Sequence, residues 1–221
     1  TSYKDPIETI TSNVVGTVNV LEALRRVKHK CCAIIITSDK CYENVEWVWG
    51  YKETDQMGGK DIYSASKGAA DLLIKSYVSS FFSDSDQLVK IATARAGNVI
   101  GGGDWAKDRV VVDCFKAWND GIPVEIRCPD ATRPWQHVLE PLSGYLTLGL
   151  DLWESGLTKG EAFNFGPKSE QNRSVLNLIH DLAVVWDFNS TSAAYSVTDT
   201  LPFNEAGLLK LNCDKALFYM K

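Results

Sequence analysis

Three features of the sequence predict an α/β fold built around a doubly wound parallel sheet. The chain of 221 residues is 45% hydrophobic and 23% charged, which is ordinary for a globular protein. Its first hundred residues alternate between helical and strand patterns, as parallel strands joined by crossover helices do. The run Ala33–Ile36 is apolar at every position, which is typical of a strand covered by helices on both faces.

Periodicity and flanking residues place the individual elements. Apolar residues recur at helical spacing within residues 6–27, and Asp5 with Pro6 forms a typical helix start. The segment AGNVIGGGDW (96–105) is too rich in glycine for a regular element, and beyond residue 190 the pattern is weak. Elsewhere we expect strands at 32–37, 88–95, 123–127 and 161–166, and helices at 62–82, 108–119, 139–154 and 174–187.

Charge and cysteine content exclude several classes of protein. The net charge of −5, without a lysine- or arginine-rich run, argues against a nucleic-acid surface. No stretch of 18 apolar residues and no signal-peptide pattern is present, so no membrane partner is expected. The six cysteines form no C-x-x-C pair and no zinc-ligand spacing, which indicates reduced thiols in the cytoplasm and no metal site.

The expected strand at 32–37 ends on polar residues that suit a ligand site. Ser38, Asp39 and Lys40 follow it directly, and in open α/β sheets ligands bind beyond the carboxyl ends of the strands. The plainer alternative is that Ser38 or Asp39 caps a turn, as such residues often do.

Tyr63 and Lys67 lie four residues apart at the start of an expected helix and so share one face. A lysine ammonium near a phenol favours the phenolate and lowers the tyrosine pKa. Such a tyrosine can take a proton from an alcohol as hydride leaves its carbon, while a nearby serine holds the alcohol oxygen. Alternatively, the two residues form an ordinary exposed helix pair.

Together, Ser38 and Tyr63-Ser-Ala-Ser-Lys67 resemble the catalytic residues of the extended short-chain dehydrogenase/reductase superfamily. Four longer blocks are similar to the CDP-glucose 4,6-dehydratases of that superfamily: TSDKCY, GYKETDQMGGKDIYSASKG, RAGNVIGGGDWAKDR and RPWQHVLEPLSGYL. The resemblance runs from about residue 1 to 166, and more loosely to LKLNCDKA near the end.

The resemblance implies a lyase that forms CDP-4-keto-6-deoxyglucose from CDP-glucose with NAD as cofactor. Ser38, Tyr63 and Lys67 would be catalytic and would also contact NAD. Asp39 would protonate the C6 hydroxyl as it leaves. Lys40 would act at C5, either as a neutral amine that removes the proton or as an ammonium that stabilises the enolate. The second position of this pair is lysine in the CDP-glucose branch.

The same resemblance implies a set of substrate-binding residues. Asn98 and Arg133 match residues beside the substrate diphosphate, and Arg109 is a second candidate clamp; arginine suits this task because its planar fork binds phosphate through two bonds. Gly101–Gly103 would either approach a phosphate or form a hinge. Asn13 resembles a helix asparagine that braces the active site, or is an ordinary polar position.

Several aromatic and histidine positions have structural rather than functional expectations. His137 is expected to be a hydrogen-bonded structural histidine. Trp47, Trp49 and Trp105 could wall the sugar or base pocket, but core packing is the favoured interpretation.

The resemblance also implies a division of the chain. Residues 1–104 would form the C-terminal part of a Rossmann-like NAD-binding domain whose first βα units, with the dinucleotide fingerprint, precede Thr1. Residues 105–221 would be mainly a smaller substrate-binding region, with 137–166 returning to the first domain. We therefore expect the isolated chain to be unstable and to have little or no activity. A homodimer is expected for the full-length protein.

Three competing interpretations remain at this stage. A nucleotide-sugar 4-epimerase of the same superfamily would use Ser38, Tyr63 and Lys67 without needing Asp39. An acyl-transfer hydrolase would use Ser64 of the S-x-x-K pattern that ends at Lys67, but the companion motifs are absent. A non-catalytic relative would only bind a nucleotide sugar. If the dehydratase prediction holds, we expect the product to supply deoxysugars for a polysaccharide.

Overall fold

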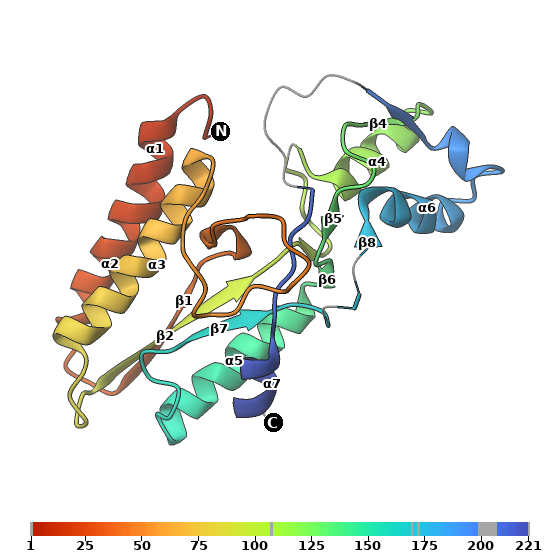
Figure 1. Cartoon of the computed structure of the whole chain (residues 1–221). Coiled ribbons are helices and arrows are strands. Elements are labelled where there is room, and N and C mark those ends of the chain that lie inside the picture. The colour runs from red at the N-terminus through yellow and green to blue at the C-terminus, as the bar shows by residue number, and fades with distance from the viewer. Residues whose placement is uncertain (1, 107, 169, 172, 199–206, 221) are drawn as a thin grey trace.

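A three-stranded parallel sheet forms the centre of the chain (Figure 1). The computed structural model describes residues 2–106, 108–168, 170–171, 173–198 and 207–220. The strand order is β1-β2-β7, formed by Cys31–Ile36, Val89–Ala96 and Ala162–Phe165. Ile36 lies opposite Ala94, and Ala94 lies opposite Phe163, both in parallel register. The predicted parallel α/β arrangement is confirmed.

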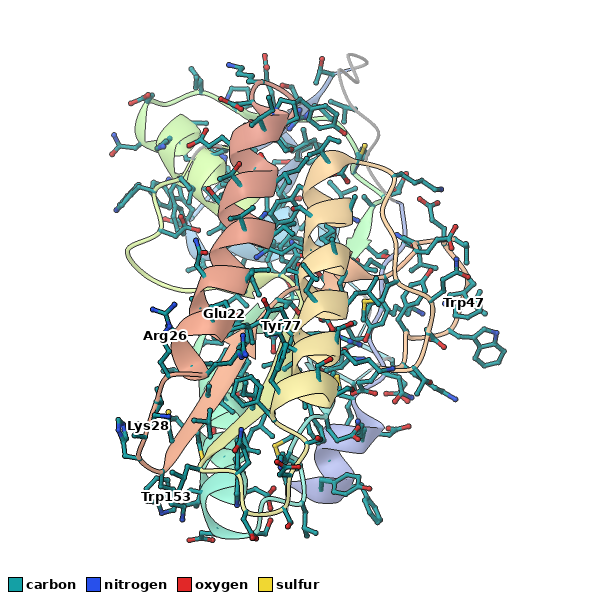
Figure 2. All side chains as sticks on the ribbon, turned by 90° about the vertical axis from the view of Figure 1, so that its left-hand side faces the viewer. Glu22, Arg26, Lys28, Trp47, Tyr77 and Trp153 are labelled. Carbon is teal, nitrogen blue, oxygen red and sulfur yellow. The ribbon has the colours of Figure 1, made fainter. Side chains whose placement is uncertain are left out.

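One face of this sheet is covered by a pair of helical segments (Figure 1). The first runs through α1 (Pro6–Ile10), a π-helical turn (Thr11–Val15) and α2 (Gly16–Leu24), and it packs along α3 (Ile62–Phe81). Glu22 on α2 and Tyr77 on α3 face one another between the helices (Figure 2). The expected start of the first helix is confirmed, because the Asp5 carboxylate accepts a hydrogen bond from the Glu8 amide at 2.8 Å.

The other face is covered by α5 (Leu139–Glu154), with α7 (Asp214–Tyr219) against β7. Strand β2 shows why both faces are buried. Val89 and Ile91 pack with the α2–α3 side, while Ala92 and Ala94 pack with α5. Successive strand side chains point to opposite faces, so an apolar strand needs helices on both sides.

A smaller lobe lies beyond the carboxyl ends of β1 and β2 (Figure 1). Its core joins α4 (Val110–Asn119) and α6 (Val175–Val185) to a parallel pair of short strands, β4 (Val124–Ile126) and β9 (Tyr195–Val197). Trp118 anchors this core, with its indole nitrogen donating to the Ala194 carbonyl oxygen at 2.8 Å.

Short strands and turns connect the sheet to this lobe. One of them corrects an expectation from the sequence. The glycine-rich segment 96–105 was expected to lack regular structure, but it contains a strand, β3, that pairs with β6. The pairing is short and is made by main-chain groups, which composition does not reveal. The remaining elements are β3 (Val99–Ile100), β5 (Thr132–Arg133), β6 (Gln136–His137), β8 (Arg173–Ser174), η2 (Asp39–Cys41) and η3 (Thr191–Ala193).

The other predicted helices and strands are present within a few residues of their expected ends. β7 lies in the central sheet although it follows residue 105 in the chain; the division into domains at residue 104 stays a prediction. All six cysteines are free thiols. Among the described residues, no helix is both long and apolar enough to cross a membrane.

The packing of α3 against the sheet gives a first test. Ile74 is 1% exposed in the cluster with Leu21 and Ile91, whereas Leu72, two residues away, is 52% exposed. We expect Ile74→Ala to lower the free energy of unfolding by about 2–5 kcal/mol, because it leaves a cavity. Leu72→Ala is the matched control and should change it by about 0.5 kcal/mol or less. Urea unfolding measures both, and equal effects would contradict the proposed packing.

Candidate active site

Ser38 and Asp39 lie where β1 ends and the short helix η2 begins. The Ser38 hydroxyl accepts a hydrogen bond from the Lys40 amide at 3.2 Å and donates one to Asp39 Oδ1 at 3.0 Å. Ser38 therefore caps the turn, as the plainer sequence interpretation expected. Both side chains are nonetheless buried beside polar groups of other elements, so capping does not exclude a role in chemistry.

Tyr63 and Lys67 approach this strand end from the first turns of α3. Asp61 caps the helix, accepting from the Ser64 amide at 3.1 Å. The Tyr63 phenol is close enough to Ser38 for their hydrogen bonding to affect the Tyr63 pKa. The Lys67 ammonium lies 5.8 Å from the centre of the Tyr63 ring. The structure thus brings Ser38, Tyr63 and Lys67 together.

The pKa of Tyr63 is shifted in the direction opposite to the one expected from the sequence. Partial burial of the phenol raises its pKa, although the Ser38 hydrogen bond and the Arg109 charge oppose this. The expected lowering by Lys67 is wrong for this structure. Lys67 is itself half-buried, which lowers its own pKa and disfavours the charge that would stabilise a phenolate.

A cavity of about 270 Å³ opens beside Lys67. Its walls include Asn13 from the π-helical turn, and Ile36 with Thr37 from the end of β1. Lys67 of α3 therefore lies at the wall of this cavity. A second cavity, of about 230 Å³ between α5, β7 and α7, contains none of the residues singled out from the sequence.

Asp39 is a buried acid with an unusual environment. It is 3% exposed, and its Oδ2 has no hydrogen-bond partner among the described residues. Burial raises the Asp39 pKa, against the opposing effects of the Lys40 charge, the Ser38 hydrogen bond and the Arg133 charge. A raised pKa favours the protonated form of a carboxyl group, which is the form that donates a proton.

Asn13 is linked to the backbone of Tyr63 through one serine. Its Nδ2 donates to Ser66 Oγ at 2.9 Å, and Ser66 Oγ donates to the Tyr63 carbonyl oxygen at 2.7 Å. The π-helical turn that carries Asn13 is a distortion of a kind frequent at functional sites. The contact agrees with the expected bracing position, while the role itself stays a prediction.

The three expected diphosphate-binding residues occupy different environments. Arg133 is 5% exposed, and its charge lowers the Asp39 pKa, so it lies near the acid. Arg109 precedes α4, is exposed, and forms an ion pair with Asp104 at 3.7 Å. Asn98 is half-buried, and its carbonyl oxygen accepts from the Gln136 amide at 3.0 Å. Their contact with a diphosphate stays a prediction.

The other residues considered from the sequence are mostly structural or exposed. His137 Nδ1 accepts from the Leu139 amide at 3.3 Å, which confirms its hydrogen-bonded structural role. Core packing of Trp47, Trp49 and Trp105 is wrong, because their exposed fractions are 40%, 70% and 66%. Trp47 stacks on Tyr51 from a surface loop and projects outward (Figure 2). Gly102 and Gly103 have open space around them.

The hydrolase interpretation fails on the position of Ser64. Its side chain is 6% exposed, and Oγ donates to Asp61 Oδ2 at 2.6 Å. This hydroxyl therefore serves the start of α3 and is not presented to a substrate.

A buried polar network under the site was missed from the sequence. Arg95 donates to both carboxylate oxygens of Asp71, and also to the Tyr42 hydroxyl at 2.8 Å. Tyr42 in turn donates to Asn164 Oδ1 at 2.7 Å. The available signals were an arginine inside the apolar strand at 88–95 and an aspartate on the buried face of the helix that precedes this strand.

Comparison with known proteins shows which families this sequence resembles. The family model described as GDP-mannose 4,6 dehydratase matches residues 1–85. CDP-glucose 4,6-dehydratase of Salmonella typhimurium is 44% identical over 97% of this chain. The resemblance inferred from the sequence is confirmed. The chain covers 60% of that relative's length.

Solved structures agree on the fold. A dTDP-glucose 4,6-dehydratase from Bacillus anthracis, in complex with NAD, has a TM-score of 0.75 and 18% identity, over 94% of this chain and 60% of its own. UDP-glucuronic acid 4-epimerase from Bacillus cereus, in complex with UDP-glucuronic acid and NAD, has a TM-score of 0.80 and 20% identity, over 96% and 62%. The predicted Rossmann-like fold is thereby confirmed.

Gly97 tests how tightly the surroundings of Asp39 are packed. A Cβ at this position would lie 2.5 Å from Pro134 Cγ and 3.3 Å from Asp39 Oδ2. We expect Gly97→Ala to lower the free energy of unfolding by about 1–3 kcal/mol through overpacking. Gly102→Ala is the control, because its added Cβ meets nothing within 4 Å. Urea unfolding measures both; an effect of Gly97→Ala no larger than that of the control would contradict the close approach.

The raised pKa of Asp39 predicts a pH dependence of stability. The folded-state pKa exceeds the unfolded value of about 4, so stability from this group is complete below about pH 4 and is lost as the pH rises through the folded value. Asp39→Asn stays neutral and lacks this dependence. We expect the variant to gain stability relative to the wild type as the pH rises. Urea unfolding across the pH range measures the difference, and a constant difference would refute the prediction.

Proposed function

We propose that the full-length protein is a nucleotide-sugar 4,6-dehydratase that converts CDP-glucose to CDP-4-keto-6-deoxyglucose and water. One observation carries the proposal: a buried acid, Asp39, adjoins Ser38 and Tyr63 at a strand end, in a chain 44% identical to a CDP-glucose 4,6-dehydratase. The pair Ser38 and Tyr63 suits oxidation and reduction at an alcohol carbon. The acid suits loss of a hydroxyl group.

NAD is the cofactor in this proposal, and the residues present fit its reactive end. Ser38, Tyr63 and Lys67 lie together, and Lys67 borders the cavity of about 270 Å³. Lys67 would hold ribose hydroxyl groups through its ammonium. NAD supplies the site with a group that accepts hydride and later returns it. Solved structures of a dehydratase and an epimerase with this fold contain NAD.

Ser38 and Tyr63 would handle the sugar hydroxyl at C4. The Ser38 hydroxyl binds this oxygen, and Tyr63 takes its proton as the carbon is oxidised to the ketone. Because burial raises the Tyr63 pKa, proton removal needs a positive charge nearby. Arg109, whose charge lowers the Tyr63 pKa, and Lys67, whose ammonium lies 5.8 Å from the centre of the Tyr63 ring, are cations near this phenol.

Asp39 would act in the dehydration that follows. A ketone at C4 acidifies the proton at C5, and departure of the C6 hydroxyl then requires a proton donor. Asp39 meets this requirement because its burial favours the protonated form. Lys40, the adjacent residue, would act at C5 as a base or as an electrostatic stabiliser of the enolate. Asn98, Arg109 and Arg133 would bind the diphosphate.

The 4-epimerase of the same superfamily is the second candidate, favoured by the structural similarity to UDP-glucuronic acid 4-epimerase. That similarity, at 20% identity, concerns the fold alone. Epimerisation uses the serine, tyrosine and lysine but has no hydroxyl group to expel. The buried carboxyl group of Asp39, whose pKa is raised, would then have no role, which favours the dehydratase over an epimerase or a purely binding relative.

The setting of the protein belongs to the same proposal. We place it in the cytoplasm, which its six free cysteines support. Its product would be a precursor of deoxysugars for a polysaccharide, and the full-length protein would be a homodimer. Its partners would be nucleotide sugars, with CDP-glucose preferred, and neither a membrane nor a nucleic acid.

An assay of the full-length protein tests the proposal. With NAD and CDP-, dTDP-, UDP- or GDP-glucose in parallel, we expect a 4-keto-6-deoxy product, detected by absorbance in alkali, most rapidly from CDP-glucose. Tyr63→Phe should lower the rate by about 100-fold or more, because the proton acceptor is lost. An exposed tyrosine, Tyr3, supplies the control Tyr3→Phe, which should leave the rate unchanged. Formation of a C4 epimer without a keto product would instead support the epimerase.

A further inference from the structure

The carboxylate of Asp71 joins three elements beneath the candidate active site. Its Oδ1 accepts from Arg95 Nη2 at 2.6 Å, and its Oδ2 accepts from Arg95 Nε at 2.9 Å. The same Oδ2 accepts a hydrogen bond from Thr37 Oγ1 at 2.8 Å. Asp71 and Arg95 are each 3% exposed. One carboxylate thus connects α3, β2 and the end of β1.

The positions of these residues relate the network directly to the site. Thr37 immediately precedes Ser38, and Asp71 follows Lys67 by one helical turn. The hydrogen bond from Thr37 to Asp71 therefore ties the strand end that carries Ser38 to the helix that carries Tyr63 and Lys67. Ser38 can act together with Tyr63 only if these two elements keep their spacing.

The ion pair also affects Lys67. At four residues from Lys67 on the same helix, Asp71 is positioned as an ordinary ion-pair partner. Arg95 instead occupies both oxygens of the Asp71 carboxylate. Among the described residues, Lys67 forms no ion pair within 4.0 Å, and it is one of the residues that line the cavity. The arrangement leaves Lys67 available to a ligand.

Stability alone does not explain this network. A buried ion pair contributes little net stability compared with apolar residues of similar volume, because desolvation offsets the attraction. What the pair provides is a fixed geometry: two parallel hydrogen bonds orient the Asp71 carboxylate. In that orientation, Oδ2 can accept a second hydrogen bond, which the Thr37 hydroxyl donates.

We propose that Asp71, held by Arg95 and bonded to Thr37, is a positioning residue that sets Ser38 at working distance from Tyr63. This inference rests on the proposed function, since it assigns Ser38 and Tyr63 to one reaction. Thr37 is the residue best suited to a test of the positioning role, because its hydroxyl can be removed while the ion pair between Arg95 and Asp71 stays intact.

The test compares Thr37→Val, Thr37→Ser and Thr93→Val in the full-length protein. Valine removes the hydroxyl with little change of shape, and serine restores it. Thr93 is a buried threonine in the neighbouring strand β2, without a side-chain hydrogen bond among the described residues, so Thr93→Val controls for the loss of a buried hydroxyl. Keto-product assays give kcat and KM, and amide hydrogen exchange at Lys40 reports on the strand end.

We expect Thr37→Val to lower kcat about tenfold or more while KM changes less than about twofold, because misplaced groups slow the reaction more than they weaken binding. Thr37→Ser should recover most of the rate. Exchange at the Lys40 amide, which is bonded to Ser38 Oγ, should be faster in Thr37→Val than in Thr93→Val. Equal kcat and equal exchange in the two valine variants would overturn the positioning role.

The two proposals fail in different ways. If Thr37→Val keeps the full wild-type rate of keto-product formation, the positioning role is wrong and the dehydratase stands. If the wild type forms no keto product from any of the four sugars, the dehydratase is wrong. Exchange at Lys40 then still tests whether Thr37 and Asp71 fix the strand end.

Discussion

The buried ion pair between Arg95 and Asp71 is the interaction on which the arrangement of the site depends. Removing one partner of such a pair costs about 3–5 kcal/mol, because the other charge is left buried and unpaired. Burial opposes the charge on Arg95, yet the hydrogen bonds and charge of Asp71 raise its pKa above the ordinary value. The pair thus provides a buried, hydrogen-bonded link between β2 and α3.

From this pair the polar network extends to both sides of the strand ends. On one side, Asp71 reaches Thr37 beside Ser38. On the other, Arg95 reaches Tyr42, which bonds Asn164 on β7. Asn164 donates to the carbonyl oxygens of Tyr51 and Asn212, so the loop after η2 and a segment close to the C-terminal helix are held by the same side chain. The carboxyl ends of all three strands are therefore joined by side chains rather than by main-chain pairing alone.

Much of this architecture could be predicted from the sequence, for identifiable reasons. Strand β1 and helices α3 and α5 have strong periodicity and clear polar boundaries, such as Asp61 before α3. The grouping of Ser38 with Tyr63 and Lys67 followed from the rule that ligands bind at strand ends. β3 was missed because two residues of main-chain pairing leave no pattern in composition. The tryptophans were misplaced because aromatic content alone does not distinguish a core from a surface loop.

Electrostatics was the least predictable aspect, because it depends on burial rather than on residue type. From the sequence, Lys67 was expected to lower the Tyr63 pKa; in the structure, burial acts on both groups and reverses the expectation. The same effect gives Asp39 its character: a surface aspartate would be ionised and unable to donate a proton, whereas this one is buried with a raised pKa.

The two effects of burial have opposite consequences for a dehydratase. A dehydratase needs an acid that stays protonated beside a tyrosine that can lose its proton. The raised pKa of Asp39 favours its protonated form, which an acid needs. The raised pKa of Tyr63 disfavours loss of its proton, which a base needs. A positive charge must therefore act on the phenol more strongly than on the carboxyl group. Arg109 supplies such a charge, since it lowers the Tyr63 pKa, and the Lys67 ammonium lies 5.8 Å from the centre of the Tyr63 ring. Because Arg95 bonds both oxygens of the Asp71 carboxylate, Asp71 does not pair with Lys67, and the lysine remains open to a ligand beside the tyrosine.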